Sequence, residues 1–370
     1  MRPTEATIDL NAIAHNVGVI KDHIGRANVC AVVKADGYGH GAVAVARTAV
    51  EAGATWLAVA LVEEGIELRE AGITTPILVL SEPRPAEMVE VVEHDLTPSV
   101  YSGSGLAAAA AAAETNRGEP LGVHLGIDTG MRRVGAEPSE VLLLANAIAA
   151  KPFLRLEGVW THCAVADEPD ASATKVQLDL FDDLVAQIHA DGHEGFMVHA
   201  GNSAVALAHP RGHYDMVRCG IAIYGIAPAK ALSGELDLRP AMTVTSEISF
   251  LKTVAAGDRI SYGLRHAFER ETQVATVPIG YADGVRRAYW RLGGDLIVNG
   301  ARRRVVGTVT MDQIMLDCGP EAPAQVGDQV VFLGAQGDHE ISATEIGERL
   351  GTIPYEVVCD IGRRVRRRYV

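Results

Sequence analysis

The stretch VCAVVKADGYGHGAVAVARTAVEA, residues 29–52, sets the pattern that the first half of the chain follows. Its apolar, β-branched start, Val29–Lys34, predicts a buried strand that ends on a lysine. A glycine-rich loop comes next, and the alanine- and valine-rich run Ala42–Ala52 predicts a helix. A strand, a loop and a helix in this order form the repeating unit of an α/β fold.

The same unit recurs through the first 225 residues. Further strands are expected at Trp56–Leu61, Ile77–Ser81, Leu96–Tyr101, Gly122–Asp128, Leu156–His162, Phe196–Ala200 and Met216–Cys219. Helices are expected between most of them, at Glu63–Ala71, Pro85–Glu93, Leu106–Thr115, Pro138–Ala149 and Ser172–Ala190. Eight strands, about 20 to 35 residues apart, favour a closed (β/α)8 barrel of the TIM type. A doubly wound sheet stays open as an alternative, because periodicity does not determine closure.

The pattern changes after about Pro240, where short β-branched runs are separated by Gly or Asp. These runs are Met242–Val254, Gln273–Pro278, Leu296–Val298, Val305–Val309, Ile314–Asp317 and Gln329–Leu333, and one short helix, Ala343–Leu350, precedes a last strand. We therefore expect a barrel over residues 10–235 and a smaller β-rich domain over residues 236–370. An opening strand within residues 1–9, at Glu5–Asp9, is expected to pack with the second domain.

Composition limits the partners and the location of the protein. A formal net charge of −14 argues against nucleic acid or an anionic membrane as a main partner, and the basic run Arg363–Arg368 is interpreted as the solvated face of the last strand. Five widely spaced cysteines without C-x-x-C predict reduced thiols and a cytoplasmic location. No apolar run approaches the roughly 20 residues of a membrane span. The thirteen histidines show no metal-binding spacing, so no metal is expected.

Lys34 and the loop after it are the first candidates for chemistry. A lysine that closes an apolar strand has a partly desolvated ammonium group, which suits Schiff-base chemistry. Tyr38 lies in the glycine-rich loop, from which its hydroxyl could reach a phosphate. Taken alone, the stretch is equally consistent with a strand-end lysine that reaches into solvent.

Several further motifs follow in chain order. They are DTGMRRVG at 128–135, THCA at 161–164, HAGNSA at 199–204, MVRCGI at 216–221, SYG at 261–263, PIGYADG at 278–284 and MDQ at 311–313. Together with VKADGYGHG at 33–41, they resemble the motifs of the alanine racemase family, whose members use pyridoxal 5′-phosphate on a barrel. The matches run in order along nearly the whole chain, so the chain is identified as a member of that family.

The resemblance implies a cofactor site. Lys34 would hold the cofactor covalently, Arg218 would contact its pyridine nitrogen, and His162 would position Arg218 or the catalytic tyrosine. The phosphate would be held by Tyr38, Ser203, the backbone of Gly220 and Ile221, and Tyr355. Most of these groups follow the seventh and eighth strands, the usual phosphate corner of a barrel.

The resemblance also implies a two-base racemisation of L- and D-alanine. Lys34 would act on one face of the α-carbon, and Tyr262 of the partner subunit would act on the other, with Met311 and Asp312 beside it. The protein would therefore be an obligate homodimer with shared active sites. Arg133 is the candidate for the substrate carboxylate, and Met311 is expected to contribute to the substrate site.

Three positions depart from the common pattern of the family. Gly126 stands where a carbamylated lysine often braces the arginine, Arg132 stands where glycine is usual, and Thr310 stands where cysteine is common. These departures leave open a racemase of the same fold for another amino acid, such as serine or a specialised metabolite. A non-catalytic pyridoxal-phosphate carrier and a decarboxylase of a related two-domain fold are further alternatives. A dinucleotide-like G-x-G-x-x-A at Gly103–Ala108 lacks a suitably placed acidic partner.

Overall fold

In the computed structural model, which describes residues 2–115, 119–168, 170, 172–319 and 324–370, the chain forms two compact units. The first contains Ile13–Gly37 and Ala42–Arg239. The second contains the residues up to Ala12, the short segment Tyr38–Gly41, and Pro240–Val370. The glycine-rich loop after Lys34 is thus shared between the two units, a division that the sequence pattern did not predict.

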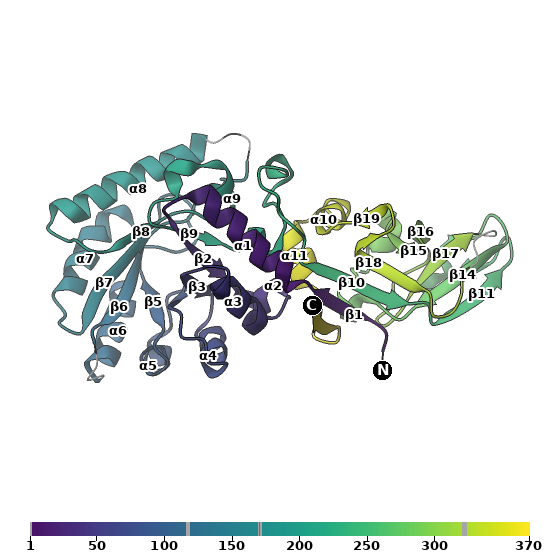
Figure 1. The fold of residues 1–370 in the computed structure, drawn as a ribbon, viewed down its shortest axis with the longest axis horizontal. Coiled ribbons are helices and arrows are strands. Elements are labelled where there is room, and N and C mark those ends of the chain that lie inside the picture. The colour runs from purple at the N-terminus through teal and green to yellow at the C-terminus, as the bar shows by residue number, and fades with distance from the viewer. Residues whose placement is uncertain (1, 116–118, 169, 171, 320–323) are drawn as a thin grey trace. The chain divides into compact units, whose positions relative to one another are not determined.

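Eight parallel strands form the sheet of the first unit (Figure 1). They are β2 (Asn28–Val32), β3 (Trp56–Val59), β4 (Ile77–Val79), β5 (Thr97–Val100), β6 (Leu121–Gly126), β7 (Leu154–Trp160), β8 (Met197–His199) and β9 (Met216–Cys219). Neighbours in the sheet follow chain order from β2 to β8, and β9 pairs with β2. A bridge between Gly201 and Val217, with Arg218 N donating to Gly201 O at 2.7 Å, links β8 to β9. The predicted barrel is confirmed, and the doubly wound alternative is wrong.

Helices alternate with these strands. They are α1 (Leu10–Ile24), α3 (Ala42–Glu51), α4 (Val62–Glu70), α5 (Met88–Glu93), α6 (Gly103–Thr115), α7 (Val141–Ala149), α8 (Ser172–Ala190) and α9 (Ser203–Ala208). All predicted helices of this unit are present, and α8 matches its prediction at both ends. The prediction failed at the end of the first strand, because β2 stops at Val32 and Lys34 begins the one-turn element α2 (Lys34–Tyr38). Positive φ angles at Ala35, Asp36 and Gly37 turn the backbone out of the sheet there.

The second unit is built around a ten-stranded sheet, in the order β11-β14-β17-β16-β15-β18-β10-β1-β20, with β19 paired to β18. Its strands are β1 (Glu5–Ile8), β10 (Met242–Glu247), β11 (Phe250–Val254), β14 (Thr272–Val277), β15 (Asp295–Val298), β16 (Ala301–Val305), β17 (Ile314–Gly319), β18 (Gln329–Gln336), β19 (His339–Ile341) and β20 (Arg366–Tyr369). A separate hairpin joins β12 (Arg259–Ile260) and β13 (His266–Ala267). The helices are α10 (Ala343–Leu350), as predicted, and α11 (Pro354–Cys359).

Several strand predictions in this unit need correction. The run Met242–Val254 is two strands, and the strand placed at Val305–Val309 lies earlier, at β16. The sequence of β16, ARRRV, exposes alternate arginines at the sheet surface, so it lacks the β-branched character used to find strands. The opening strand β1 pairs antiparallel with β10 and parallel with β20.

The basic run at the C-terminus is only partly a solvated face. Arg366 and Arg368 lie on one side of β20 and pair with Glu5. Arg367 points the other way and donates to the backbone oxygens of Gly39 and Gly362 at 2.9 and 2.6 Å. No helix in the described part of the chain is long and apolar enough to span a bilayer.

Candidate active site

The carboxyl ends of β7, β8 and β9 bring together a buried cation and two imidazoles. Arg218 on β9 is 4% exposed. It donates from Nη1 to His199 Nδ1 at 2.7 Å and from Nη2 to the backbone oxygen of Thr161 at 2.8 Å. His162 Nδ1 lies 3.4 Å from the same Nη2. In the described residues Arg218 therefore has neutral acceptors as partners and forms no ion pair with a carboxylate.

The hydrogen bonds that Arg218 donates determine which nitrogen carries the proton on His199 and, in turn, on His124. A guanidinium group only donates hydrogen bonds, so His199 must accept at Nδ1 and carry its own proton on Nε2. His199 Nε2 then donates to Nδ1 of His124, on β6, at 2.8 Å. Nε2 of His124 is buried and has no hydrogen-bond partner among the described residues. The three side chains form one chain of hydrogen bonds that ends inside the barrel.

Burial keeps these histidines neutral. It lowers the pKa of His124 to about 3 and lowers that of His199 well below the usual value, and the charge of Arg218 acts in the same direction. Burial also lowers the pKa of His162 to about 3, with added effects from the positive charges of Arg218, Arg133 and Lys34.

The positive charge at this end of the barrel is carried by Arg218, Arg133 and Lys34, which all act on His162. Burial lowers the pKa of Arg218 to about 10, so the side chain stays charged at neutral pH. A neutral histidine among three cations makes the strand ends a binding place for anionic groups.

The segments after β8 and β9 supply donors for a phosphate. Ser203 begins α9, and its Oγ accepts from the backbone nitrogens of Gly220 at 3.0 Å and Ala222 at 3.4 Å. Gly220 also caps the one-turn helix η4 (Ile221–Tyr224). A serine hydroxyl beside backbone N–H groups at helix starts is the kind of donor set that binds phosphate. These residues fit the cofactor that the motifs predicted.

The loop after β6 contains the predicted carboxylate-binding arginine. Asp128 is buried and accepts from the backbone nitrogens of Gly130 and Arg132 at 2.8 and 3.1 Å. Arg132 has φ of 58°, a left-handed conformation that explains why glycine is common at this position. Arg133 is exposed and forms no hydrogen bond or ion pair with any described residue. Its guanidinium group is therefore available to a ligand.

A side chain at position 126 would crowd Trp160. A Cβ atom at this position would lie 3.1 Å from Cε2 and 3.2 Å from Cζ2 of Trp160, on the neighbouring strand β7. The indole fills the space that a side chain at 126 would need. The departure from the family pattern is thus matched by a large neighbour, and no other described side chain takes over the contact with Arg133.

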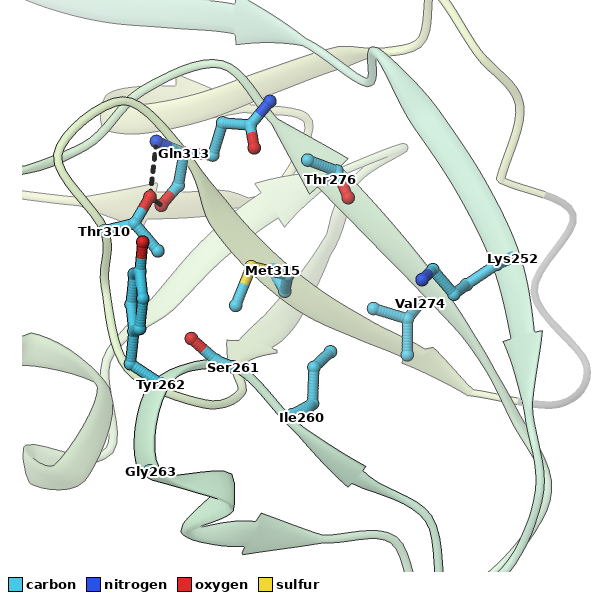
Figure 2. Close-up of a pocket in the computed structure, with 10 residues that line it drawn as sticks. All are labelled: Lys252, Ile260, Ser261, Tyr262, Gly263, Val274, Thr276, Thr310, Gln313 and Met315. Atoms are coloured by element: carbon cyan, nitrogen blue, oxygen red, sulfur yellow. Dashed lines mark hydrogen bonds between the residues drawn. The ribbon is translucent and has the colours of Figure 1, made fainter.

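In the second unit, Tyr262 stands on a tight turn after β12 and is 71% exposed. The turn has positive φ at Ser261 and Gly263, and Thr308 Oγ1 donates to the backbone oxygen of Tyr262 at 3.0 Å. Figure 2 shows the ring beside Thr310 at one side of a pocket of about 500 Å³, with Lys252 at the far side. The pocket is lined by Lys252, Ile260, Ser261, Tyr262, Gly263, Val274, Thr276, Thr310, Gln313 and Met315.

Other predicted residues of this unit lie on its surface and in its loops. Met311 is exposed, and Asp312 next to it accepts from Arg364 Nη2 at 2.7 Å. Arg364 is in turn paired with the fully buried Asp283, at 3.3 Å. Tyr38 and Tyr355, the two predicted phosphate hydroxyls, have ring centroids 6.2 Å apart.

Sequence reasoning missed the buried shell of Arg218. His124 and His199 each interrupt an otherwise apolar strand, which was the available signal, and His199 lies within a quoted motif. Trp160 gave no signal of its own, because a tryptophan at a strand end is an ordinary core residue. No group of three His, Cys, Asp or Glu side chains in the described residues could hold a metal ion.

Two family models match the chain: alanine racemase, N-terminal domain, over residues 8–228, and alanine racemase, C-terminal domain, over residues 241–369. An alanine racemase of Symbiobacterium thermophilum is 44% identical over 375 residues, covering 100% of this chain and 97% of that protein. Alanine racemase 1 of Bacillus subtilis is 41% identical, with coverage of 100% and 93%.

Solved structures agree. The alanine racemase from D-cycloserine-producing Streptomyces lavendulae matches with a TM-score of 0.94 at 40% identity, covering 100% of this chain and 97% of its own. The Bacillus anthracis enzyme with bound L-Ala-P matches with a TM-score of 0.94 at 38% identity, with coverage of 100% and 95%. The motif resemblance is confirmed by these matches in both units, and the chain belongs to the alanine racemase family.

Proposed function

We propose that this protein interconverts L- and D-alanine with pyridoxal 5′-phosphate, as a cytoplasmic homodimer with shared active sites that supplies D-alanine for peptidoglycan precursors. The observation that carries the proposal is Arg218, a buried cation held by neutral acceptors at the strand ends of the barrel. The names of the full-length relatives support alanine as the substrate. The second unit, with Tyr262, argues against a carrier, which would lack it.

Most of the groups proposed to hold the cofactor belong to the barrel unit. Lys34 would bind it covalently, and Ser203 with the backbone of Gly220 and Ile221 would donate to its phosphate, together with Tyr38 and Tyr355. When bound, pyridoxal 5′-phosphate supplies the electron-withdrawing ring that acidifies the α-hydrogen of an amino acid.

Arg218 would donate a hydrogen bond to the pyridine nitrogen. As a cation it stabilises a protonated ring poorly, because like charges repel. By leaving the ring unprotonated, Arg218 would weaken its pull on electrons and so would favour return of the proton to the α-carbon over side reactions. His162 and His199 are neutral, so they would hold the guanidinium group in place as hydrogen-bond acceptors and would leave its positive charge unpaired.

Two groups would move the proton. The Lys34 amine would act on one face of the α-carbon, and the hydroxyl of Tyr262 of the partner subunit would act on the other. Arg133 would bind the substrate carboxylate, since no group of the described residues pairs with it, and Met311 would border the substrate. The high exposure of Tyr262 in its own unit supports a role toward another subunit.

The test is deuterium incorporation at the α-carbon in heavy water, measured by NMR, with L-alanine, L-serine and a panel of other amino acids as substrates. Exchange with inversion on alanine is the expected result. Exchange confined to serine or another amino acid would keep the chemistry and replace the substrate. Absence of exchange, with the cofactor bound, would favour the carrier. Carbon dioxide release would indicate a decarboxylase, and sedimentation velocity would test the dimer.

A further inference from the structure

Trp160 at the end of β7 lies directly against the buried cation of the site. Its side chain is 5% exposed. Arg218 Cζ lies 5.0 Å from the centroid of its ring, within the range of a cation–π interaction. The ring is also stacked on His199, with an interplanar angle of 12°. Trp160 therefore packs against both Arg218 and one of its hydrogen-bond acceptors.

The position of the indole depends on Gly126. The two residues are paired across β6 and β7, and an added Cβ at 126 would lie within 3.2 Å of Cε2, Cζ2 and Nε1 of the ring. Even a methyl group would require the indole to move by a few tenths of an ångström. The position of Trp160 therefore depends on glycine at position 126.

The indole acts through its face and not through its nitrogen. Nε1 of Trp160 is buried and donates to no atom of the residues that the structure describes. A buried N–H without an acceptor opposes stability, so another interaction must favour tryptophan here. The ring face provides one, because a cation–π contact that is shielded from water is stronger than an exposed one.

We propose that Trp160 is a positioning residue for Arg218, and that Gly126 provides the space it needs. The indole face and the acceptors His199 and Thr161 O hold the guanidinium group from different sides. The inference rests on the proposed contact between Arg218 and the cofactor ring. It gives a physical reason for glycine at 126 that involves the cofactor arginine, not the substrate arginine.

Three variants of the cofactor-bound enzyme test the role of Trp160: Trp160→Phe, Trp160→Leu and Gly126→Ala. The readouts are the dissociation constant of pyridoxal 5′-phosphate, the absorbance band of the bound cofactor across pH, and kcat and KM for alanine. Trp160→Leu should weaken cofactor binding about tenfold or more and shift the band, because it removes a buried cation–π contact. It should lower kcat more than it changes KM. Trp160→Phe keeps an aromatic face and should stay within about threefold of wild type.

Gly126→Ala is the second, milder perturbation, and it should move the same readouts in the same direction because it displaces the indole. Phe181→Leu is the matched control: it removes a fully buried aromatic ring that packs on Tyr214, away from Arg218. It should lower the urea midpoint and leave the cofactor band in place. Equal losses in Trp160→Phe and Trp160→Leu, or an unchanged band in Trp160→Leu, would overturn the proposal. An unmodified protein that binds cofactor but does not racemise alanine would contradict the proposed function instead.

Discussion

Replacing His199 by phenylalanine removes the middle of the chain Arg218–His199–His124 and should cost about 2.5 to 6 kcal/mol of unfolding free energy. The charge-assisted bond from Arg218, at 2.7 Å, contributes about 1.5 to 3 kcal/mol. The lost donor leaves His124 Nδ1 unsatisfied inside the barrel, which adds about 1 to 3 kcal/mol. Both histidines are fully buried, so water does not replace the lost partners.

The assay is urea unfolding, monitored by circular dichroism. All variants are measured at one protein concentration, so that any subunit association contributes equally to each unfolding free energy. The informative comparison is a double-mutant cycle with His124→Leu. If the chain of hydrogen bonds is real, His199→Phe should cost less when His124 is already absent, because no imidazole is then left without a donor. We expect a coupling of about 1 to 2 kcal/mol. Additive effects, within about 0.5 kcal/mol, would refute the assignment of protons along this chain.

Three other predictions follow from the site. Burial lowers the pKa of His124 to about 3 and lowers that of His199 well below its usual value, so both are neutral when folded and their contribution to stability is complete above pH 6.5. Each should cost about 1.4 kcal/mol per pH unit as the pH falls below 6.5, seen as a lower urea midpoint at pH 5 than at pH 7. A midpoint that stays constant would contradict their neutral burial. Tyr262→Phe should abolish racemisation and keep the cofactor absorbance, whereas Lys34→Ala should remove both; full racemisation by the tyrosine variant would exclude the two-base scheme. Arg132→Gly should be more stable to urea than Arg132→Ala by about 1 kcal/mol, because only glycine adopts φ of 58° without strain, and the reverse order would show that the loop relaxes.

The sequence was most informative where burial on both faces imposed a simple pattern. All eight barrel strands and most of the helices between them were located, because parallel strands in a barrel are mostly apolar runs, but the short helix α9 was not predicted. The pattern failed where exposure or turn geometry took over. β16 exposes alternate arginines, and the strand before Lys34 ends early at a left-handed turn that includes Ala35 and Asp36, residue types that do not announce positive φ as glycine does.

The candidate site was predicted as a set of residues but not as an arrangement. Motifs identified Arg218, Ser203 and Lys34, because resemblance carries single positions. His162 was predicted beside Arg218, but His124 and His199 were not, since a histidine in an apolar strand has many uses and only the barrel's closure brings β6, β8 and β9 together. Contacts across strands depend on register, which a single sequence does not contain.

Gly126 shows how such a contact changes the meaning of a residue. In the sequence alone, Gly126 replaces the lysine that is common at this position. That lysine braces the substrate arginine, so its replacement suggests a different substrate. Read across the sheet, it is the residue opposite Trp160, and the indole that needs its space lies against the cofactor arginine. On the proposed role of Trp160 this glycine acts on Arg218, and it then gives no reason of its own to change the substrate. An effect of position 126 on cofactor binding that exceeds its effect on the KM for alanine is what separates these two interpretations.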